Sequence, residues 1–324
     1  MPNLDGGHYF LTVLAPIDNR RPVEHDGIRS SPVHVVREAL ETLPTALQSP
    51  ATEQIGLNSP FSRNRRTHFA RFAVLDDVFY NGRDPVDSIV SAVVGPNPIQ
   101  AQPVDDLACP YLLFVADFDP DGASASEPRS YLEGLWDIMP RELEAVFGHC
   151  YGFDAVKDRA AFADFVVACQ VETTMPFNDY WVGAPPLPNR LPWFIVAPAL
   201  AALASIGLAF WIPHTWIAPA HAQFAAWLAA TVGLLLVALG IDYGLVMTLG
   251  QRPFPAAPNA TLPHVLKALY LQQAFTRFAA AHQGDEPAAL RQAFAAFVEQ
   301  TRPDDLAGPT QGPGVVKAQL GQGA

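Results

Sequence analysis

The sequence predicts an α+β protein with three parts: a ferredoxin-like βαββαβ domain, a two-helix transmembrane hairpin and a C-terminal helix pair. Two uncharged apolar segments of 23 and 20 residues lie close together after residue 190. Before them, strand-like and helix-like segments alternate in the βαββαβ order. After them, apolar residues recur at helical spacing on both sides of Gly284. The predicted division is 1–185 for the domain, 191–213 and 222–247 for the spans, 260–302 for the helix pair and 303–324 for a disordered tail.

The two apolar segments are long enough to cross a bilayer. As a helix, residues 191–213 rise about 35 Å at roughly 1.5 Å per residue, against a hydrocarbon core about 30 Å thick. Trp193 and Trp211 lie near the ends of this segment and Trp227 near the start of the next, where indole rings favour the headgroup level. Core helices of soluble proteins rarely run this far without a polar face. We therefore expect both segments to bind the lipid bilayer as a hairpin.

Basic residues predict the orientation of the hairpin. Arg190 precedes the first segment and Arg252 follows the second, whereas the loop at 214–221 contains no lysine or arginine. The positive-inside rule then places the parts on both sides of the hairpin in the cytoplasm. Residues 1–14 show no basic and apolar regions of a signal peptide, which agrees with this orientation. The expected location is the inner (plasma) membrane, as a multi-pass protein with cytoplasmic N- and C-termini.

The negative charge is concentrated before the hairpin. Up to Arg190 there are 14 basic and 26 acidic residues, a net charge of −12, while the rest of the chain has 6 of each. Nucleic-acid binding requires basic patches, so this composition argues against a nucleic-acid partner. The three cysteines form no CxxC pair, which in a cytoplasmic chain predicts reduced thiols.

The first half of the domain is predicted to contain a strand, a helix and a second strand. Residues 8–17 are rich in aromatic and β-branched types, which indicates a strand. Ser31 followed by proline is typical of a helix start, and apolar residues then recur at helical spacing to about Leu47. Residues 66–76 form the second predicted strand. Residues 77–106 are rich in Pro, Gly, Asn and Asp and are expected to form an irregular insertion with one helical turn near 86–93.

The second half of the domain completes the predicted plan. Residues 110–118 are apolar nearly throughout, which is typical of a central strand. A helix at 127–142 capped by Ser126, a short fourth strand at 144–153 and a last helix at 158–171 follow. Such a sheet carries helices on one face, so its other face must meet a second copy, the extra helix or a ligand.

Four motifs carry a resemblance to a known family. They are His68-Phe69-Ala70-Arg71-Phe72, Leu112-Leu113-Phe114 with Phe118-Asp119, Tyr131-Leu132, and Phe147-Gly148-His149-Cys150-Tyr151-Gly152-Phe153. Over residues 9–180 the chain resembles bacterial proteins of the dimeric α+β-barrel superfamily that occur beside haem peroxidases of the dye-decolourising type. The resemblance implies a homodimer and a role close to a redox enzyme. The Gly-x-x-Asp-Gly signature of the peroxidases themselves is absent.

Three residues are candidates for cofactor binding: His68, Arg71 and His149. A neutral imidazole can ligate haem iron or a metal, and an arginine can hold a carboxylate or a propionate. His68 and Arg71 lie on one predicted strand with opposite parity, so alternation places them on opposite faces. His149 adjoins Cys150, but adjacent strand residues diverge and do not chelate one ion.

Each candidate also has a structural alternative. The histidines can bond a neighbouring strand, and the arginine can pair with Asp117 or Asp119. Near the membrane, His214 and His221 are able to bind a metal or a quinone headgroup, although histidines are common at this level. Asp242 lies about a turn and a half from the cytoplasmic end, which favours a helix-end role over an intramembrane one. No nucleotide-binding, serine-hydrolase or zinc-protease motif occurs, so the sequence identifies no catalytic residue, leaves enzymatic activity open and predicts no metal site.

These observations predict a membrane-anchored domain that binds a ligand or partner through its open sheet face. It is expected to act as a homodimer or as an accessory to a redox enzyme. The alternative is a haem-dependent, peroxidase-like oxidoreductase with His68 or His149 as the iron ligand inside the α+β barrel. A third possibility is a structural subunit that docks a larger membrane complex.

The orientation is testable by protease protection. Inverted vesicles expose the cytoplasmic face, so added protease should degrade the 1–185 domain there, whereas the domain should survive in spheroplasts. Immunoblotting of the domain gives the readout, with a known cytoplasmic membrane protein as the control. Survival of the domain in inverted vesicles in which the control is degraded would contradict the cytoplasmic orientation.

Overall fold

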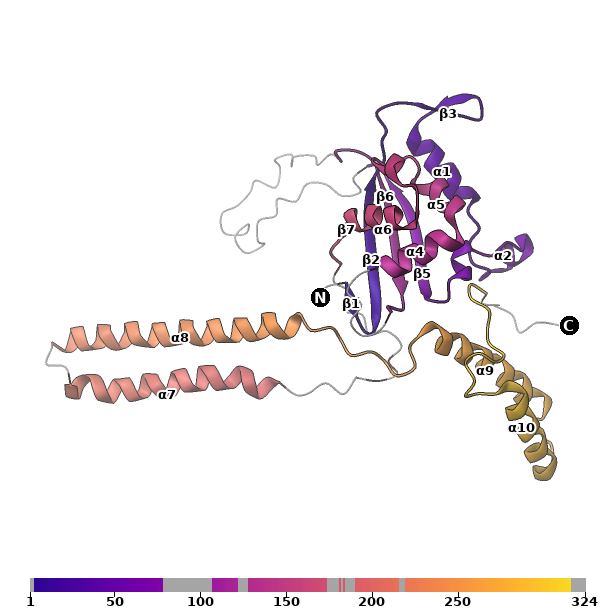
Figure 1. The fold of residues 1–324 in the computed structure, drawn as a ribbon. Helices are drawn as coiled ribbons and strands as arrows, with labels where there is room; N and C mark the ends of the chain where they lie inside the picture. Colours follow the sequence, from indigo (N-terminus) through magenta and orange to yellow (C-terminus); the bar gives the residue numbers. More distant parts are fainter. Residues whose placement is uncertain are drawn as a thin grey trace, which may run out of the picture.

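The computed structural model describes residues 3–77, 107–121, 128–173, 181, 183, 190–215 and 219–315. Within these residues the protein is a mixed α+β structure with an antiparallel sheet and two long apolar helices that project away from it (Figure 1). The helical turn predicted near 86–93 and the predicted cap Ser126 lie outside the described residues.

The sheet is antiparallel and is centred on two long strands. These are β2 (His8–Pro16) and β6 (Tyr111–Phe118), which pair along their length. β5 (Thr67–Leu75) pairs with the other side of β6, while β1 (Leu4–Asp5) and β7 (Gln170–Val171) pair with β2. These three long strands confirm the strands predicted at 8–17, 66–76 and 110–118. The predicted loop after β2 carries a separate hairpin of β3 (Val23–His25) and β4 (Ile28–Ser30).

Helices cover one face of this sheet. They are α1 (Pro32–Thr42), α4 (Arg129–Ile138), α5 (Pro140–Phe147) and α6 (Arg159–Ala168). Their apolar stripes meet alternate residues of β2 and β6 in one core, which includes Leu11, Val13, Phe114, Phe118, Leu132, Leu135, Phe147, Phe162 and Val166. Because α6 packs in this core, it does not cover the opposite face. Thr12, Leu14, Leu113 and Val115 on that face stay partly exposed.

The prediction of a fourth strand at 144–153 is wrong. α5 extends to Phe147 and takes up the first four residues of this segment, with Pro140 in its first turn and Leu143, Val146 and Phe147 buried at helical spacing. The residues after it form a turn that leads to a short helix at 153–155. The aromatic content favours a strand, but the i, i+3, i+4 burial decides for a helix. The strand that completes the sheet is β7, which the sequence predicted as the end of a helix.

Prolines shorten two predicted helices. The helix predicted for 127–142 is broken at Met139, because the residue before a proline is driven out of the α-helical region. α1 ends at Thr42 rather than near Leu47, and Pro44 follows directly after its C-cap. Between α1 and β5 lie the short helices α2 (Pro50–Ile55) and η1 (Pro60–Arg63), and η2 (Phe153–Ala155) follows α5.

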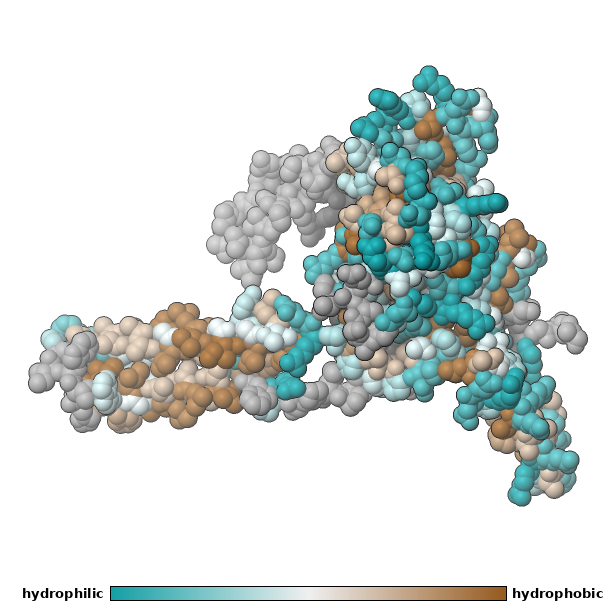
Figure 2. Space-filling model, viewed as in Figure 1, coloured by the Kyte–Doolittle hydropathy of each residue, from teal (hydrophilic) through white to brown (hydrophobic). Residues whose placement is uncertain are grey.

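The two apolar segments form the antiparallel helices α7 (Leu191–Thr215) and α8 (Ala220–Gly250). Both are long and apolar enough to span a membrane. Their outer surface is a continuous apolar band (Figure 2), with side chains such as Leu236 at 63% exposure. A pair of soluble core helices would bury this surface, so the exposure is what lipid contact requires. Between the helices, Ser205 Oγ and Thr231 Oγ1 lie 2.8 Å apart.

The helix pair predicted after the apolar hairpin is present as α9 (Leu262–Ala281) and α10 (Pro287–Thr301). Aromatic residues join the two helices, with the rings of Phe278 and Phe297 centred 4.9 Å apart. Lys267 is 2% exposed and donates to the main-chain oxygens of Thr301 at 2.8 Å and Pro309 at 3.0 Å. This buried ammonium therefore connects α9 to the end of α10 and to the segment beyond.

Residues 303–315 are ordered, although the sequence predicts disorder from residue 303. The Leu47 amide donates to the Gly314 oxygen at 2.8 Å, and Asn58 donates to the Pro313 oxygen at 3.0 Å. Composition identifies segments that lack apolar residues to bury. It does not reveal hydrogen-bond partners more than 250 residues away in the chain, and these partners hold the segment against the domain.

The segment after α8 runs along the membrane-proximal end of the sheet. The Phe254 amide donates to the Asp5 carboxylate, and the Gly6 amide donates back to the Phe254 oxygen at 3.1 Å. Gly7 has a positive φ of 87°, and a Cβ built there would lie 2.5 Å from the Cβ of Ala256. Glycine is therefore required at this contact both for its backbone conformation and for the space.

Gly7→Ala should loosen this contact. Gly27 is a matched control, because its φ is also positive at 76° but nothing lies within 4 Å of a Cβ built there. Both substitutions carry the strain of a left-handed residue, about 1–2 kcal/mol, and only Gly7→Ala adds overlap with Ala256. We expect a lower melting temperature and faster hydrogen exchange at 251–260 for Gly7→Ala than for Gly27→Ala. Equal behaviour of the two variants would contradict the close approach.

Candidate functional site

A buried polar cluster lies where three strands meet, at the end of the sheet nearest the apolar hairpin. His8 begins β2, His68 lies near the start of β5, and Asp119 follows β6. His68 Nε2 lies 3.0 Å from Asp119 Oδ1, and His8 Nδ1 lies 3.6 Å from the same oxygen. The two imidazole rings meet edge to face with their centroids 4.6 Å apart. The cluster combines two imidazoles and a carboxylate within the fold.

A β-bulge places His68 in this cluster. Thr67 is paired with Phe118 and Phe69 with Asp117, so His68 is an extra residue between two consecutive partners on β6. A bulge interrupts the alternation of side chains and redirects the extra one. The sequence predicted that alternation along the strand would place His68 and Arg71 on opposite faces of the sheet. Because of the bulge, the alternation does not hold for this pair. The bulge directs the imidazole toward Asp119 and His8 instead.

Both carboxylate oxygens of Asp119 are engaged. Oδ1 faces the two histidines, and Oδ2 accepts a hydrogen bond from the Leu262 amide at 2.8 Å. Leu262 is the first residue of α9, so the carboxylate lies where the helix presents unpaired N–H groups and partial positive charge. Arg66 holds the Asp119 backbone, because its Nε donates to the Asp119 oxygen at 2.8 Å. The orientation of the carboxylate is thus set from two sides.

A groove of about 470 Å³ extends from this cluster along β5. His68 and Arg71 both line it, so the structure brings together two of the three predicted site residues. The Arg71 guanidinium lies over the Phe69 ring, 5.2 Å from its centroid. The walls are mainly apolar and come from α1, η1, β5 and α9; they include Leu40, Leu43, Phe61, Phe72, Val265, Leu266 and Leu269.

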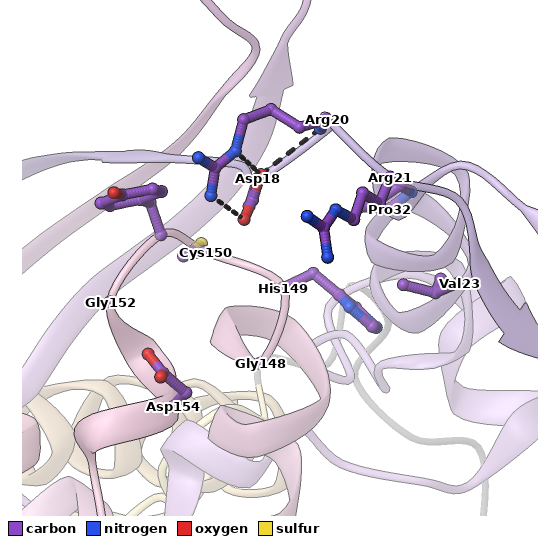
Figure 3. A pocket seen from close by; sticks show the side chains of 11 residues that line it. Asp18, Arg20, Arg21, Val23, Pro32, Gly148, His149, Cys150, Gly152 and Asp154 are labelled. Atoms are coloured by element: carbon purple, nitrogen blue, oxygen red, sulfur yellow. Dashed lines mark hydrogen bonds and ion pairs between the residues drawn. The ribbon is translucent and has the colours of Figure 1, made fainter.

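His149, the third predicted site residue, lies in a different pocket of about 440 Å³ (Figure 3). This pocket is formed by the turn after α5 and the segment after β2. There Asp18 accepts two hydrogen bonds from the Arg20 side chain at 2.7 Å, and this pairing lowers the pKa of Asp18 to about 2. Burial, followed by the charge of His25, lowers the pKa of His149.

Cys150 lines the same pocket. Its side chain is buried, and burial raises the pKa of the thiol to about 12. The thiolate is the reactive form of cysteine, so a thiol with this pKa is inert near neutral pH. The His149-Cys150 pair therefore has a structural place in the turn, where the His149 oxygen accepts from the Asp18 amide at 2.9 Å.

The candidates near the membrane lie far from the cluster. The side chain of His214 lies outside the described residues, while His221 is exposed at the start of α8. α8 continues to Gly250, so Asp242 lies about 12 Å from its end at 1.5 Å per residue. Asp242 is therefore deeper in the apolar band than the sequence predicted.

Two residues of the cluster were not predicted as site residues. His8 looks like the first residue of an ordinary strand, and Asp119 was considered only as a partner of Arg71. The pairing of β2 with β6 brings them together across 111 positions of the sequence. The remaining signal was the presence of polar residues at the ends of three strands, which does not by itself show that those ends meet.

The chain matches no protein-family model, no curated protein and no solved structure. The resemblance to the dimeric α+β-barrel superfamily therefore stays a prediction. The site is characterised by its own geometry.

The lowered pKa of His149 predicts acid sensitivity. In the folded protein this histidine resists protonation, whereas in the unfolded chain it takes a proton near its ordinary pKa of about 6.5. The unfolded state binds more protons below that pH, so stability falls as the pH drops below about 6.5. His149→Gln should lose less melting temperature than the wild type between pH 7.5 and pH 5.5. An equal loss in both proteins would show that His149 does not contribute.

Proposed function

We propose that this chain is a membrane-anchored binding domain of the ferredoxin-like type. The strands are ordered β7–β2–β6–β5, all antiparallel, with the helices on one face, which supports that plan. The apolar helices α7 and α8 support anchoring in the inner membrane. The basic residues Arg190 and Arg252 support an orientation in which the domain lies on the cytoplasmic side.

The groove along β5 carries the binding role. It combines an apolar wall with one guanidinium, from Arg71, and one imidazole, from His68. Ligand sites are typically concave and mostly apolar with a few polar groups that fix orientation. A guanidinium pairs best with a carboxylate or phosphate, often through two hydrogen bonds. The matching ligand is an amphipathic molecule with an apolar body and an acidic headgroup.

The opposite face of the sheet supports association with a second copy. Leu14, Leu113 and Val115 on this face are partly exposed and Phe69 is 46% exposed, although the face also carries the polar side chains of Thr12 and Arg71. α6 packs on the helical side of the sheet, so this face remains available. An antiparallel sheet buries such a face against another sheet or a partner. A role as accessory to a redox enzyme rests on the family resemblance alone.

The haem-dependent alternative is less well supported by the site geometry. The His68 side chain is 3% exposed and its Nε2 is hydrogen-bonded to Asp119, so ligation of haem iron requires that bond to break. His149 lies in the separate pocket beside Asp18 and Arg20 rather than on a strand. A binding role for the groove requires neither change.

Haemin is a suitable probe, because it has an apolar macrocycle and two carboxylates. We expect the detergent-solubilised protein to bind haemin in the groove, with a shift of its absorption band. Arg71→Ala should weaken binding by about 10- to 100-fold, the effect of losing one charge-assisted hydrogen bond. Arg29→Ala, which removes an exposed arginine from β4, controls for net charge, and His149→Ala controls for the second pocket.

The variants separate the hypotheses. If Arg29→Ala or His149→Ala weakens haemin binding as much as Arg71→Ala, the groove is not the site. If a band that shifts on reduction disappears in His68→Ala but persists in Arg71→Ala, iron ligation by His68 is favoured and the haem-dependent alternative replaces the binding role.

A further inference from the structure

The donor atoms of the buried cluster have the spacing of metal ligands. His8 offers an imidazole nitrogen, His68 offers another and Asp119 offers a carboxylate oxygen, and the three atoms lie within 4.8 Å of one another. At metal–ligand distances of about 2.0–2.1 Å, the ligands of a tetrahedral ion are about 3.4 Å apart. The observed separations from Asp119 Oδ1 are 3.0 Å to His68 Nε2 and 3.6 Å to His8 Nδ1. These two separations differ from that spacing by a few tenths of an ångström.

We propose that His8, His68 and Asp119 form a binding site for a divalent first-row transition metal. Two of the three donors are imidazoles, which suit Zn²⁺, Fe²⁺ or Co²⁺ and are poor ligands for Mg²⁺ or Ca²⁺. Two histidines and one carboxylate on adjacent strands leave further coordination positions open. This site shares His68 with the groove, but the metal proposal does not rest on the amphipathic ligand proposed there.

The charges around the cluster favour a cation. Asp117 lies beside Asp119, with its Oδ1 3.9 Å from His8 Nδ1, and the side chains of these two aspartates are only 19% and 13% exposed. Two carboxylates in a partly desolvated site are stabilised by a counter-charge. Arg66 binds the Asp121 carboxylate at 2.9 Å and the main-chain oxygen of Asp119. A divalent ion would neutralise the pair of aspartates at their centre.

The surroundings also hold the ligands in place. His8 is 1% exposed on a central strand, and His68 is fixed by the bulge in β5. Asp119 keeps Oδ1 toward the histidines because the Leu262 amide holds Oδ2. Partners of this kind orient metal ligands and raise metal affinity. When Oδ1 binds the ion, the hydrogen bond to α9 can remain.

A second group of possible ligands, His25, Asp26 and Glu38, provides the matched control. Its donor atoms satisfy the same 4.8 Å limit, but its residues lie at the surface, where acidic groups are common without an ion. Removing His25 deletes one imidazole beside a carboxylate, as removing His8 does. Comparison of the two variants therefore separates the buried cluster from weak surface binding.

Zn²⁺ titration of the full-length chain, purified in detergent without a histidine tag and stripped of metal, tests the site. We expect one Zn²⁺ per chain and a higher melting temperature on binding. His8→Ala should weaken binding by at least about 100-fold, because loss of a ligand exceeds the effect of losing an orienting partner. His25→Ala and Arg71→Ala should bind Zn²⁺ like the wild type. Normal Zn²⁺ binding by Arg71→Ala with altered haemin binding would show that the two sites are separate.

X-ray absorption at the zinc edge of the wild-type protein covers the case in which His8→Ala does not fold. The expected spectrum shows two imidazoles with oxygen ligands and no sulfur. Failure of the wild type to bind Zn²⁺, unchanged binding by folded His8→Ala, loss of binding in His25→Ala, or sulfur ligation would each overturn the proposal.

Discussion

The position of the Asp119 carboxylate determines how the parts of this protein meet. One oxygen bonds His68 on the edge strand and faces His8 on the central strand, while the other accepts from the first amide of α9. Hydrogen bonds to a charged group typically contribute about 1.5–3 kcal/mol, twice the value of neutral ones. A single side chain thus connects the sheet to α9, the helix that follows the apolar hairpin.

This connection gives the groove along β5 its second wall. One side of the groove comes from α1 and η1, which belong to the domain core, and the other comes from α9. α9 is held at its N-terminus by Asp119, while the segment beyond α10 bonds Leu47 and Asn58 on the domain. The groove therefore requires both the domain that precedes the apolar hairpin in the sequence and the helix α9 that follows it. Asp119 belongs to the polar cluster and also holds the start of α9, which forms one wall of the groove.

The apolar hairpin of α7 and α8 imposes a geometric constraint on the domain. α7 and α8 are antiparallel, so the chain leaves and returns at the same end (Figure 1). The returning segment passes against Asp5, Gly6 and Gly7 before it reaches α9. The candidate site consequently lies at the end of the sheet that faces the hairpin.

The long strands, most of the helices and the apolar hairpin could be predicted from local patterns in the sequence. In β2, β6, α7 and α8, the order of apolar and polar residues along the sequence is enough to predict the element, because each side chain's environment follows from its position in the local repeat. The segment at 144–153 was predicted as a strand because of its aromatic residues, whereas its first residues belong to α5 and are buried at helical spacing. The order of 303–315 depends on partners distant in the sequence. The grouping of residues at the site could be seen only in the folded structure. The bulge at His68 and the meeting of His8 with Asp119 arise from strand register, and register is set by contacts between strands that no local pattern encodes.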